Sequence, residues 1–262
     1  MQKGRGCRLR SEYQLFVRDD PKSPAAEAIR SLRTNLQFVG LDRSLRSVMV
    51  TSAGPSEGKT SIASNLAASL AESGIKTIVV GVDLRKPALH RVFERSNRIG
   101  LTNLLLGQTS LEDALQETDV PNLRLLAAGP IPPNPAEMLG TEAMRAVHEK
   151  LVAAAEMVVY DSTPIAAVTD AVVLSRIVDG VIFVVAVRQT PRELVRKAKE
   201  QLEQVRANIL GVVANRVEVR GSEGYYYYYY GDNEAAATGT GRASSRTRPV
   251  LGRVLARLLG RS

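Results

Sequence analysis

The chain has 262 residues, enough for one large α/β domain with a well-buried core. Its formal net charge is +8, but the excess lies at the two ends. Residues 1–10 carry four basic side chains and residues 242–262 carry six arginines, and neither stretch contains an acid. Without those ten, the 35 basic residues fall to 25, which nearly match the 27 acidic ones. A near-neutral body excludes a basic nucleic-acid groove across the core.

Cysteine, histidine and hydropathy patterns exclude several other classes of protein. Cys7 is the only cysteine and cannot form an internal disulfide, which fits a reducing cytoplasm. His90 and His148 stand alone and do not indicate a metal site. No apolar run approaches the roughly 18 residues that span a bilayer, and residues 1–30 lack the hydrophobic core of a signal peptide. We therefore expect a cytoplasmic protein that is attached to a membrane at most peripherally.

Residues 1–22 are polar and basic, and we expect them to be flexible. A helix signal follows, in which Ser23 can cap the first turn and Pro24 suits the first helical position. Up to residue 217, β-branched runs then alternate with helical patterns. The expected strands are Ser47–Thr51, Thr77–Val82, Leu123–Ala127, Met157–Asp161, Val181–Val187 and Ile209–Ala214. The expected helices between them are Thr60–Glu72, Thr141–Ala155, Ala167–Ile177 and Arg192–Val205. This alternation predicts a single α/β domain over residues 23–217, a P-loop NTPase-like parallel sheet with helices on both faces.

The pattern changes in residues 218–248, which we interpret as a tyrosine cluster and a disordered linker. The cluster consists of Tyr225, Tyr226, Tyr227, Tyr228, Tyr229 and Tyr230. Six consecutive aromatic residues cannot present one face, so they suit phosphate acceptors better than a core; an edge strand or contact segment is the alternative. Residues 249–262 carry the stripe of a basic amphipathic helix, which could lie on an anionic membrane or dock on a protein.

The strongest chemical signal is a phosphate loop. Its residues are Ala53, Gly54, Pro55, Ser56, Glu57, Gly58, Lys59, Thr60 and Ser61. The loop follows an apolar strand and opens a helix, the context in which backbone N–H groups cradle phosphate oxygens. Lys59 can reach the β- and γ-phosphates of ATP, and Thr60 can ligate Mg²⁺. Ala53 stands where a glycine is usual, and Gly54 adjoins it.

Polar residues follow three other expected strands. Asp161 ends one of them as a Walker B aspartate does, and Asp83 follows another. Alone, either would be an ordinary strand-end aspartate, but beside a phosphate loop both are candidate Mg²⁺ ligands. Asn215 and Arg216 follow the last expected strand and are further candidates for nucleotide binding, since ligands on parallel sheets lie at the carboxyl ends of the strands.

Together these motifs resemble those of the bacterial tyrosine kinases that accompany capsule and exopolysaccharide synthesis. The shared features are the proline-containing phosphate loop, the Asp-x-Arg-x-Pro-x-x-His stretch from Asp83 to His90, the Walker B aspartate, a Glu-x-x-Arg-x-x-Arg motif and the tyrosine cluster. The resemblance covers roughly residues 23–231. It implies ATP and Mg²⁺ as cofactors, phosphorylation of the tail tyrosines, and catalytic roles for Lys59, Asp83, Arg85 and Asp161.

The Glu-x-x-Arg-x-x-Arg motif consists of Glu27, Arg30 and Arg33. On a helix these side chains fall within about 120° of one another, opposite an apolar face, so they could meet a second subunit or simply face solvent. The resemblance favours self-association through this face. It also implies a membrane-bound polysaccharide co-polymerase as activator, and hence a location at the inner face of the cell membrane.

We therefore expect an ATP-dependent protein-tyrosine autokinase that regulates exopolysaccharide or capsule synthesis and export. One alternative is a switch ATPase related to ParA and MinD, but those proteins carry a second lysine early in the phosphate loop, and Ser52–Pro55 contains none. Another is a nucleotide-binding regulator with a degenerate kinase site. The family's acidic strand motif normally has two aspartates, and Gly81 occupies the first position here. The departure predicts that nucleotide binding survives while transfer is weakened or lost.

Overall fold

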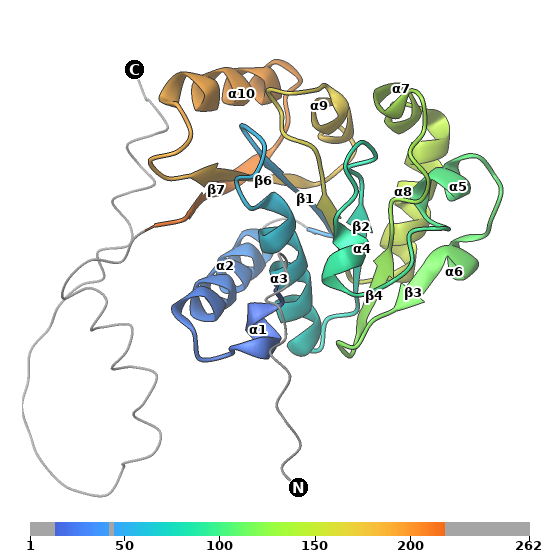
Figure 1. Cartoon of the computed structure of the whole chain (residues 1–262), viewed down its shortest axis with the longest axis horizontal. Helices are drawn as coiled ribbons and strands as arrows, with labels where there is room; N and C mark the ends of the chain where they lie inside the picture. Colours follow the sequence, from blue (N-terminus) through green and yellow to red (C-terminus); the bar gives the residue numbers. More distant parts are fainter. Residues whose placement is uncertain (1–13, 42–44, 218–262) are drawn as a thin grey trace, which may run out of the picture. The chain divides into compact units, whose positions relative to one another are not determined.

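A computed structural model describes residues 14–41 and 45–217 of the chain (Figure 1). The tyrosine cluster and the amphipathic pattern of residues 249–262 lie outside the described residues, as do residues 1–13. No helix in the described ranges combines the length and the apolar character that crossing a membrane requires.

In the described part of the chain, one seven-stranded sheet has the order β3-β4-β2-β5-β1-β6-β7. The strands are β1 Ser47–Ser52, β2 Thr77–Gly81, β3 Leu115–Glu117, β4 Leu123–Leu126, β5 Met157–Asp161, β6 Gly180–Ala186 and β7 Ile209–Asn215. All six expected strands are confirmed, and all pair in parallel. The edge strand β3 pairs antiparallel with β4 and was not predicted, because three half-exposed residues give no periodic signal.

Helices cover both faces of the sheet, as expected (Figure 1). They are α1 Phe16–Asp19, α2 Pro24–Leu41, α3 Lys59–Glu72, α4 Leu89–Val92, α5 Leu101–Leu105, α6 Leu111–Ala114, α7 Pro135–Leu139, α8 Glu142–Ala154, α9 Asp170–Leu174 and α10 Arg192–Gln204. Apolar side chains of α1 to α4 form one core with the sheet, and those of α5 to α10 form a second core. Ser23 caps α2 as predicted, since its Oγ accepts a hydrogen bond from the Ala26 N–H at 3.2 Å. The expected helix Ala167–Ile177 is shorter than predicted, and α4 to α7 were not predicted.

The N-terminal segment differs from the sequence expectation. Residues 1–22 were expected to be flexible, yet in their described part Leu15 and Val17 are buried and belong to the core that contains α3. Asn65 on α3 holds this segment, because its Oδ1 accepts the Val17 N–H at 3.1 Å and its Nδ2 donates to the Gln14 carbonyl at 3.0 Å. The expectation is therefore wrong for residues 14–17, where the short apolar run Leu15–Val17 anchors the chain on the body.

We expect Asn65→Ala to lower the free energy of unfolding by about 1–3 kcal/mol, because it leaves the buried Val17 N–H without an acceptor. Urea denaturation followed by circular dichroism would measure the change. Asn35→Ala, on the exposed side of α2, is the matched control and should stay within about 0.5 kcal/mol of the parent. Equal stability of the two variants would show that Asn65 does not hold the segment.

Candidate active site

The phosphate loop connects β1 to α3, as the sequence predicts. Gly58 has φ of 96°, and a Cβ at this position would lie 2.1 Å from Asn215 Nδ2, so glycine is required there. The first helical hydrogen bond of α3 runs from the Ile62 N–H to the Gly58 carbonyl at 2.9 Å. The N–H groups of Thr60 and Ser61 therefore have no partner within the helix, and the start of α3 can bind an anion.

Strand register brings the two predicted aspartates to this loop. Asp161 on β5 pairs with Val50 on β1 and with Gly81 on β2, so it lies between the strand that leads into the loop and the strand that leads to Asp83. Its carbonyl also accepts the Val82 and Asp83 N–H groups at 2.9 and 3.2 Å. The ends of three neighbouring parallel strands thus converge on one point.

Side chains from these strand ends surround the ammonium group of Lys59. Its Nζ lies 3.1 Å from Asp83 Oδ2 and 3.8 Å from Asp161 Oδ1. The hydroxyl of Thr60 donates to Asp161 Oδ1 at 3.1 Å. The structure therefore brings together the three predicted metal ligands, Thr60, Asp83 and Asp161, around the predicted catalytic lysine.

The cluster carries more negative than positive charge in a buried place. Asp161 is 1% exposed, and burial raises the pKa of its carboxyl group, while Lys59 and the Thr60 hydroxyl oppose that rise. Hydroxyl and carboxylate oxygens are ligands that Mg²⁺ prefers, and Mg²⁺ commonly takes only one or two carboxylates plus substrate phosphates. Accordingly, no group of three or more His, Cys, Asp or Glu in the described ranges could hold a metal by itself. The donor set fits a Mg²⁺ ion bound together with a nucleotide.

Arg85, another predicted catalytic residue, points its guanidinium group at Asp170. Nε and Nη2 donate to the two carboxylate oxygens at 2.9 and 3.0 Å, and these bonds raise the pKa of Arg85. Asp170 is the first residue of α9 and is buried. Sequence reasoning missed Asp170, although an acid in the first turn of an expected helix was the available signal. Arg85 thus fastens the segment after β2 to α9, and its catalytic role stays a prediction.

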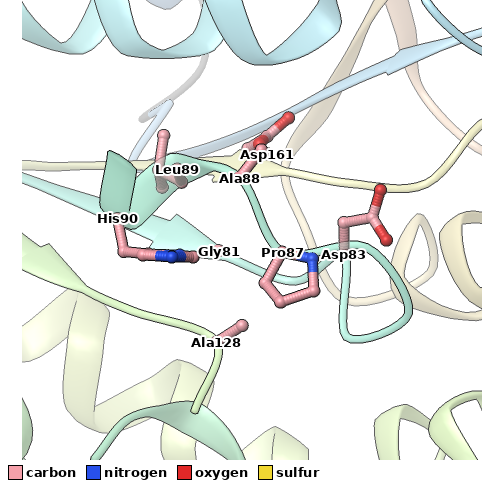
Figure 2. A pocket seen from close by; sticks show the side chains of 8 residues that line it. All are labelled: Gly81, Asp83, Pro87, Ala88, Leu89, His90, Ala128 and Asp161. Atoms are coloured by element: carbon pink, nitrogen blue, oxygen red, sulfur yellow. The ribbon is translucent and has the colours of Figure 1, made fainter. Parts of the chain in front are cut away.

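A small hollow lies beside the carboxylates, bordered by Gly81, His90, Asp83 and Asp161 (Figure 2). His90 Nδ1 is buried and has no hydrogen-bond partner among residues 14–41 and 45–217. Burial lowers the pKa of His90. A Cβ at position 81 would lie 3.3 Å from the Ala128 backbone N, so a side chain there needs a shift of a few tenths of an ångström. By register, it would project beside Asp161.

Asn215 and Arg216, which were predicted to bind the nucleotide, lie at the phosphate loop and contact its backbone. Asn215 Nδ2 donates to the Glu57 carbonyl at 2.8 Å, and Arg216 Nη2 donates to the Ser56 carbonyl at 2.7 Å. These contacts place both side chains at the nucleotide site. Their direct contact with a nucleotide stays a prediction.

The three residues of the predicted self-association motif do not behave alike. Glu27 and Arg30 form an exposed ion pair at 2.9 Å on α2. The Arg33 guanidinium instead donates to the Ser69 carbonyl of α3 at 3.0 Å. Arg33 therefore packs on the body and does not stand on the free charged face that the helical pattern predicted.

Comparison with known proteins agrees with this geometry. Residues 48–227 match the family described as the CobQ/CobB/MinD/ParA nucleotide binding domain. The chain is 40% identical over 228 residues to the tyrosine-protein kinase YwqD of Bacillus subtilis, covering 86% of this chain and 95% of that protein. It is 36% identical to the putative tyrosine-protein kinase CapB of Staphylococcus aureus, covering 83% and 96% of the two chains.

The chain belongs to the bacterial tyrosine kinase family. Two solved structures of that family resemble this fold. The chimerical protein CapA2B2 has a TM-score of 0.75 at 38% identity, covering 78% of this chain and 90% of that one. The kinase domain of Escherichia coli tyrosine kinase ETK has a TM-score of 0.77 at 32% identity, with coverages of 84% and 85%. The chain is thus a nucleotide-binding P-loop domain of this family.

The burial of Asp161 leads to a prediction that does not depend on catalysis. We expect Asp161→Asn to raise the melting temperature of the nucleotide-free protein at pH 7 by about 2 °C, because it removes a charge that burial disfavours. The same variant should lose most of the further rise that Mg²⁺ and ADP produce in the parent. Differential scanning fluorimetry measures both, with Asp20→Asn, on the surface, as a control that changes neither. A lower melting temperature without nucleotide would show that the contact with Lys59 outweighs the desolvation.

Proposed function

We propose that this protein is an ATP-dependent protein-tyrosine autokinase that transfers the γ-phosphate of ATP to tyrosines of its own tail, Tyr225–Tyr230. The observation that carries the proposal is the placement of Lys59 between Asp83 and Asp161 at the phosphate loop. This placement occurs in a chain that is 40% identical to a tyrosine-protein kinase over nearly its whole length.

Each side chain of the cluster has a role in this reaction. The N–H groups at the start of α3 bind phosphate oxygens, and Lys59 neutralises the charge that develops during transfer. Thr60, Asp83 and Asp161 would hold Mg²⁺, which would supply positive charge that offsets the negative charge of the phosphates during transfer. A phenol has a pKa near 10, so the acceptor tyrosine also benefits from a carboxylate that receives its proton, and Asp83 is the less buried of the two aspartates.

The regulatory setting is part of the proposal. One similar solved structure is a chimerical protein, CapA2B2. The activator that we propose for this chain is a membrane-bound polysaccharide co-polymerase. The activator would bring the kinase to the inner face of the cell membrane, where phosphorylation of the tail regulates polymer synthesis and export. Self-association would use the exposed Glu27–Arg30 pair, with Arg33 holding α2 in place. Residues 249–262 would contact either the membrane surface or a protein partner.

A second candidate, a nucleotide-binding regulator that does not transfer phosphate, is favoured by one observation. Gly81 supplies no side chain at the position beside Asp161. The two candidates share the nucleotide site and differ in the product that they form.

We expect the purified protein, given ATP and Mg²⁺, to accumulate phosphotyrosine in residues 225–230, more strongly in the presence of the activator segment. Immunoblotting and mass spectrometry would locate the modification. Lys59→Ala should abolish it, because the phosphates lose their neutralising cation. Replacing the six tyrosines with phenylalanine should abolish the tail signal while ATP binding persists.

The outcomes separate the candidate functions. Phosphate release without phosphotyrosine would favour a switch ATPase. Nucleotide binding with neither product would favour the regulator.

We expect Gly81→Asp to raise the initial rate of autophosphorylation by about tenfold, because a third carboxylate would join Asp83 and Asp161. Gly81→Asn has nearly the same shape without the charge and is the matched control. The rates would be compared at equal concentrations of protein and saturating ATP. A rate for Gly81→Asp at or below that of the parent would show that the two native aspartates suffice.

A further inference from the structure

Glu57 is the only acidic residue of the phosphate loop, and it is 4% exposed. Its side chain folds back over the start of the loop. Oε1 accepts hydrogen bonds from the Gly54 N–H at 2.9 Å and from the Thr190 hydroxyl at 2.7 Å. Oε2 accepts the Ala53 N–H at 3.3 Å. All three donors are uncharged groups.

A buried carboxylate in a loop that binds anions is electrostatically unfavourable, both through its desolvation and through repulsion of the incoming phosphates. The three hydrogen bonds offset part of this electrostatic cost, and they also indicate what the side chain does. The Glu57 carboxylate accepts from the N–H groups of Ala53 and Gly54, at the start of the loop, and not from those at the start of α3. It therefore braces the loop without competing for the donors that bind phosphate.

Gly54 permits this arrangement. A Cβ at position 54 would lie 3.1 Å from Glu57 Oε1 and 3.4 Å from Leu194 Cδ2 on α10. The carboxylate can therefore close over the loop because residue 54 carries no side chain.

Thr190 connects this brace to the segment between β6 and α10. Gln189, its neighbour in the chain, accepts a hydrogen bond from Arg216, and Arg216 in turn donates to the Ser56 carbonyl. The contacts form a closed ring through the phosphate loop, the β6–α10 loop and the end of β7. A loop held from two sides in this way has little freedom to change its curvature before the nucleotide arrives.

We propose that Glu57 is a positioning residue for nucleotide binding, which acts with Thr190 to preset the curvature of the phosphate loop. It contacts no phosphate; it holds the backbone whose N–H groups do. This inference rests on the proposed binding of ATP, but not on transfer to tyrosine. A preset loop avoids the ordering step that phosphate binding would otherwise require, so removal of the brace weakens affinity for phosphates and leaves contacts with the nucleoside intact.

The test measures the affinities of Glu57→Ala, Glu57→Gln and Thr190→Val for Mg²⁺·ADP and for adenosine, by competition with a fluorescent nucleotide. We expect Glu57→Ala to weaken ADP binding by about tenfold or more and adenosine binding by less than about twofold. Glu57→Gln keeps one carbonyl acceptor and should lose less. Thr190→Val should weaken ADP binding by about threefold in the parent and have no effect in the Glu57→Ala background, because the two groups act through one contact.

Glu203→Ala is the matched control, since Glu203 is an exposed glutamate on α10 that pairs with Lys199, away from the loop. It should leave both affinities unchanged. Equal ADP affinity in Glu57→Ala and the parent would overturn the inference, and so would equal losses for ADP and adenosine, which indicate general damage to the fold. If Glu57→Ala does not fold, the ADP affinity of Thr190→Val tests the inference instead. An ADP affinity equal to that of the parent would then overturn it. A parent that fails to bind ADP overturns the proposed function as well.

Discussion

The site depends on one electrostatic arrangement, the ammonium group of Lys59 between the carboxylates of Asp83 and Asp161. Neither carboxylate is close to Lys59 in sequence, and both come to it because β5 lies between β1 and β2 in the sheet. Asp161 is in register with Val50 before the phosphate loop and with Gly81 before Asp83. A one-residue shift of β5 would turn Asp161 to the opposite face of the sheet and separate it from Lys59. The parallel register is thus as much a part of the site as its side chains are.

The net negative charge of this cluster favours the binding of a cation. Two carboxylates lie beside one ammonium group in a buried place, so the cluster has an excess of negative charge that burial disfavours. In the proposed function, Mg²⁺ that binds together with the phosphates would offset this charge, and Lys59 would contact the phosphates. The affinity for Mg²⁺ with a nucleotide would then exceed what the phosphate loop provides alone, and stability and nucleotide binding would be linked through the same three side chains.

Several charged residues of the recognised motifs hold elements together. Arg85 fastens the segment after β2 to the buried Asp170 of α9. Arg33 fastens α2 to α3, which is the helix that begins at the phosphate loop. Arg216 fastens the end of β7 to the loop itself, one residue before the chain leaves the described region. These contacts join α2, α9 and the end of β7 to elements that border the nucleotide site.

The sequence alone determined the α/β class, all six parallel strands and the phosphate loop, because continuous apolar runs and a glycine–lysine loop have local physical signatures. It also identified Asp83 and Asp161, since each directly follows or ends a buried strand. The short elements β3 and α4 to α7 could not be predicted, because they contain too few residues to show a period. Likewise, the anchoring of Leu15 and Val17 could not be predicted, because an apolar run of three residues is too short to show a period.

Only the tertiary structure decided what the charged side chains contact. Glu27, Arg30 and Arg33 share one helical pattern, yet Arg33 binds α3 because the Ser69 carbonyl in the last turn of that helix lies within its reach. Glu57 gave no signal beyond its place in a motif, and its role depends on Thr190, which is 133 residues away. Contacts of this kind are set by sheet order and loop geometry, and no local pattern in a chain encodes the partner that folding brings alongside.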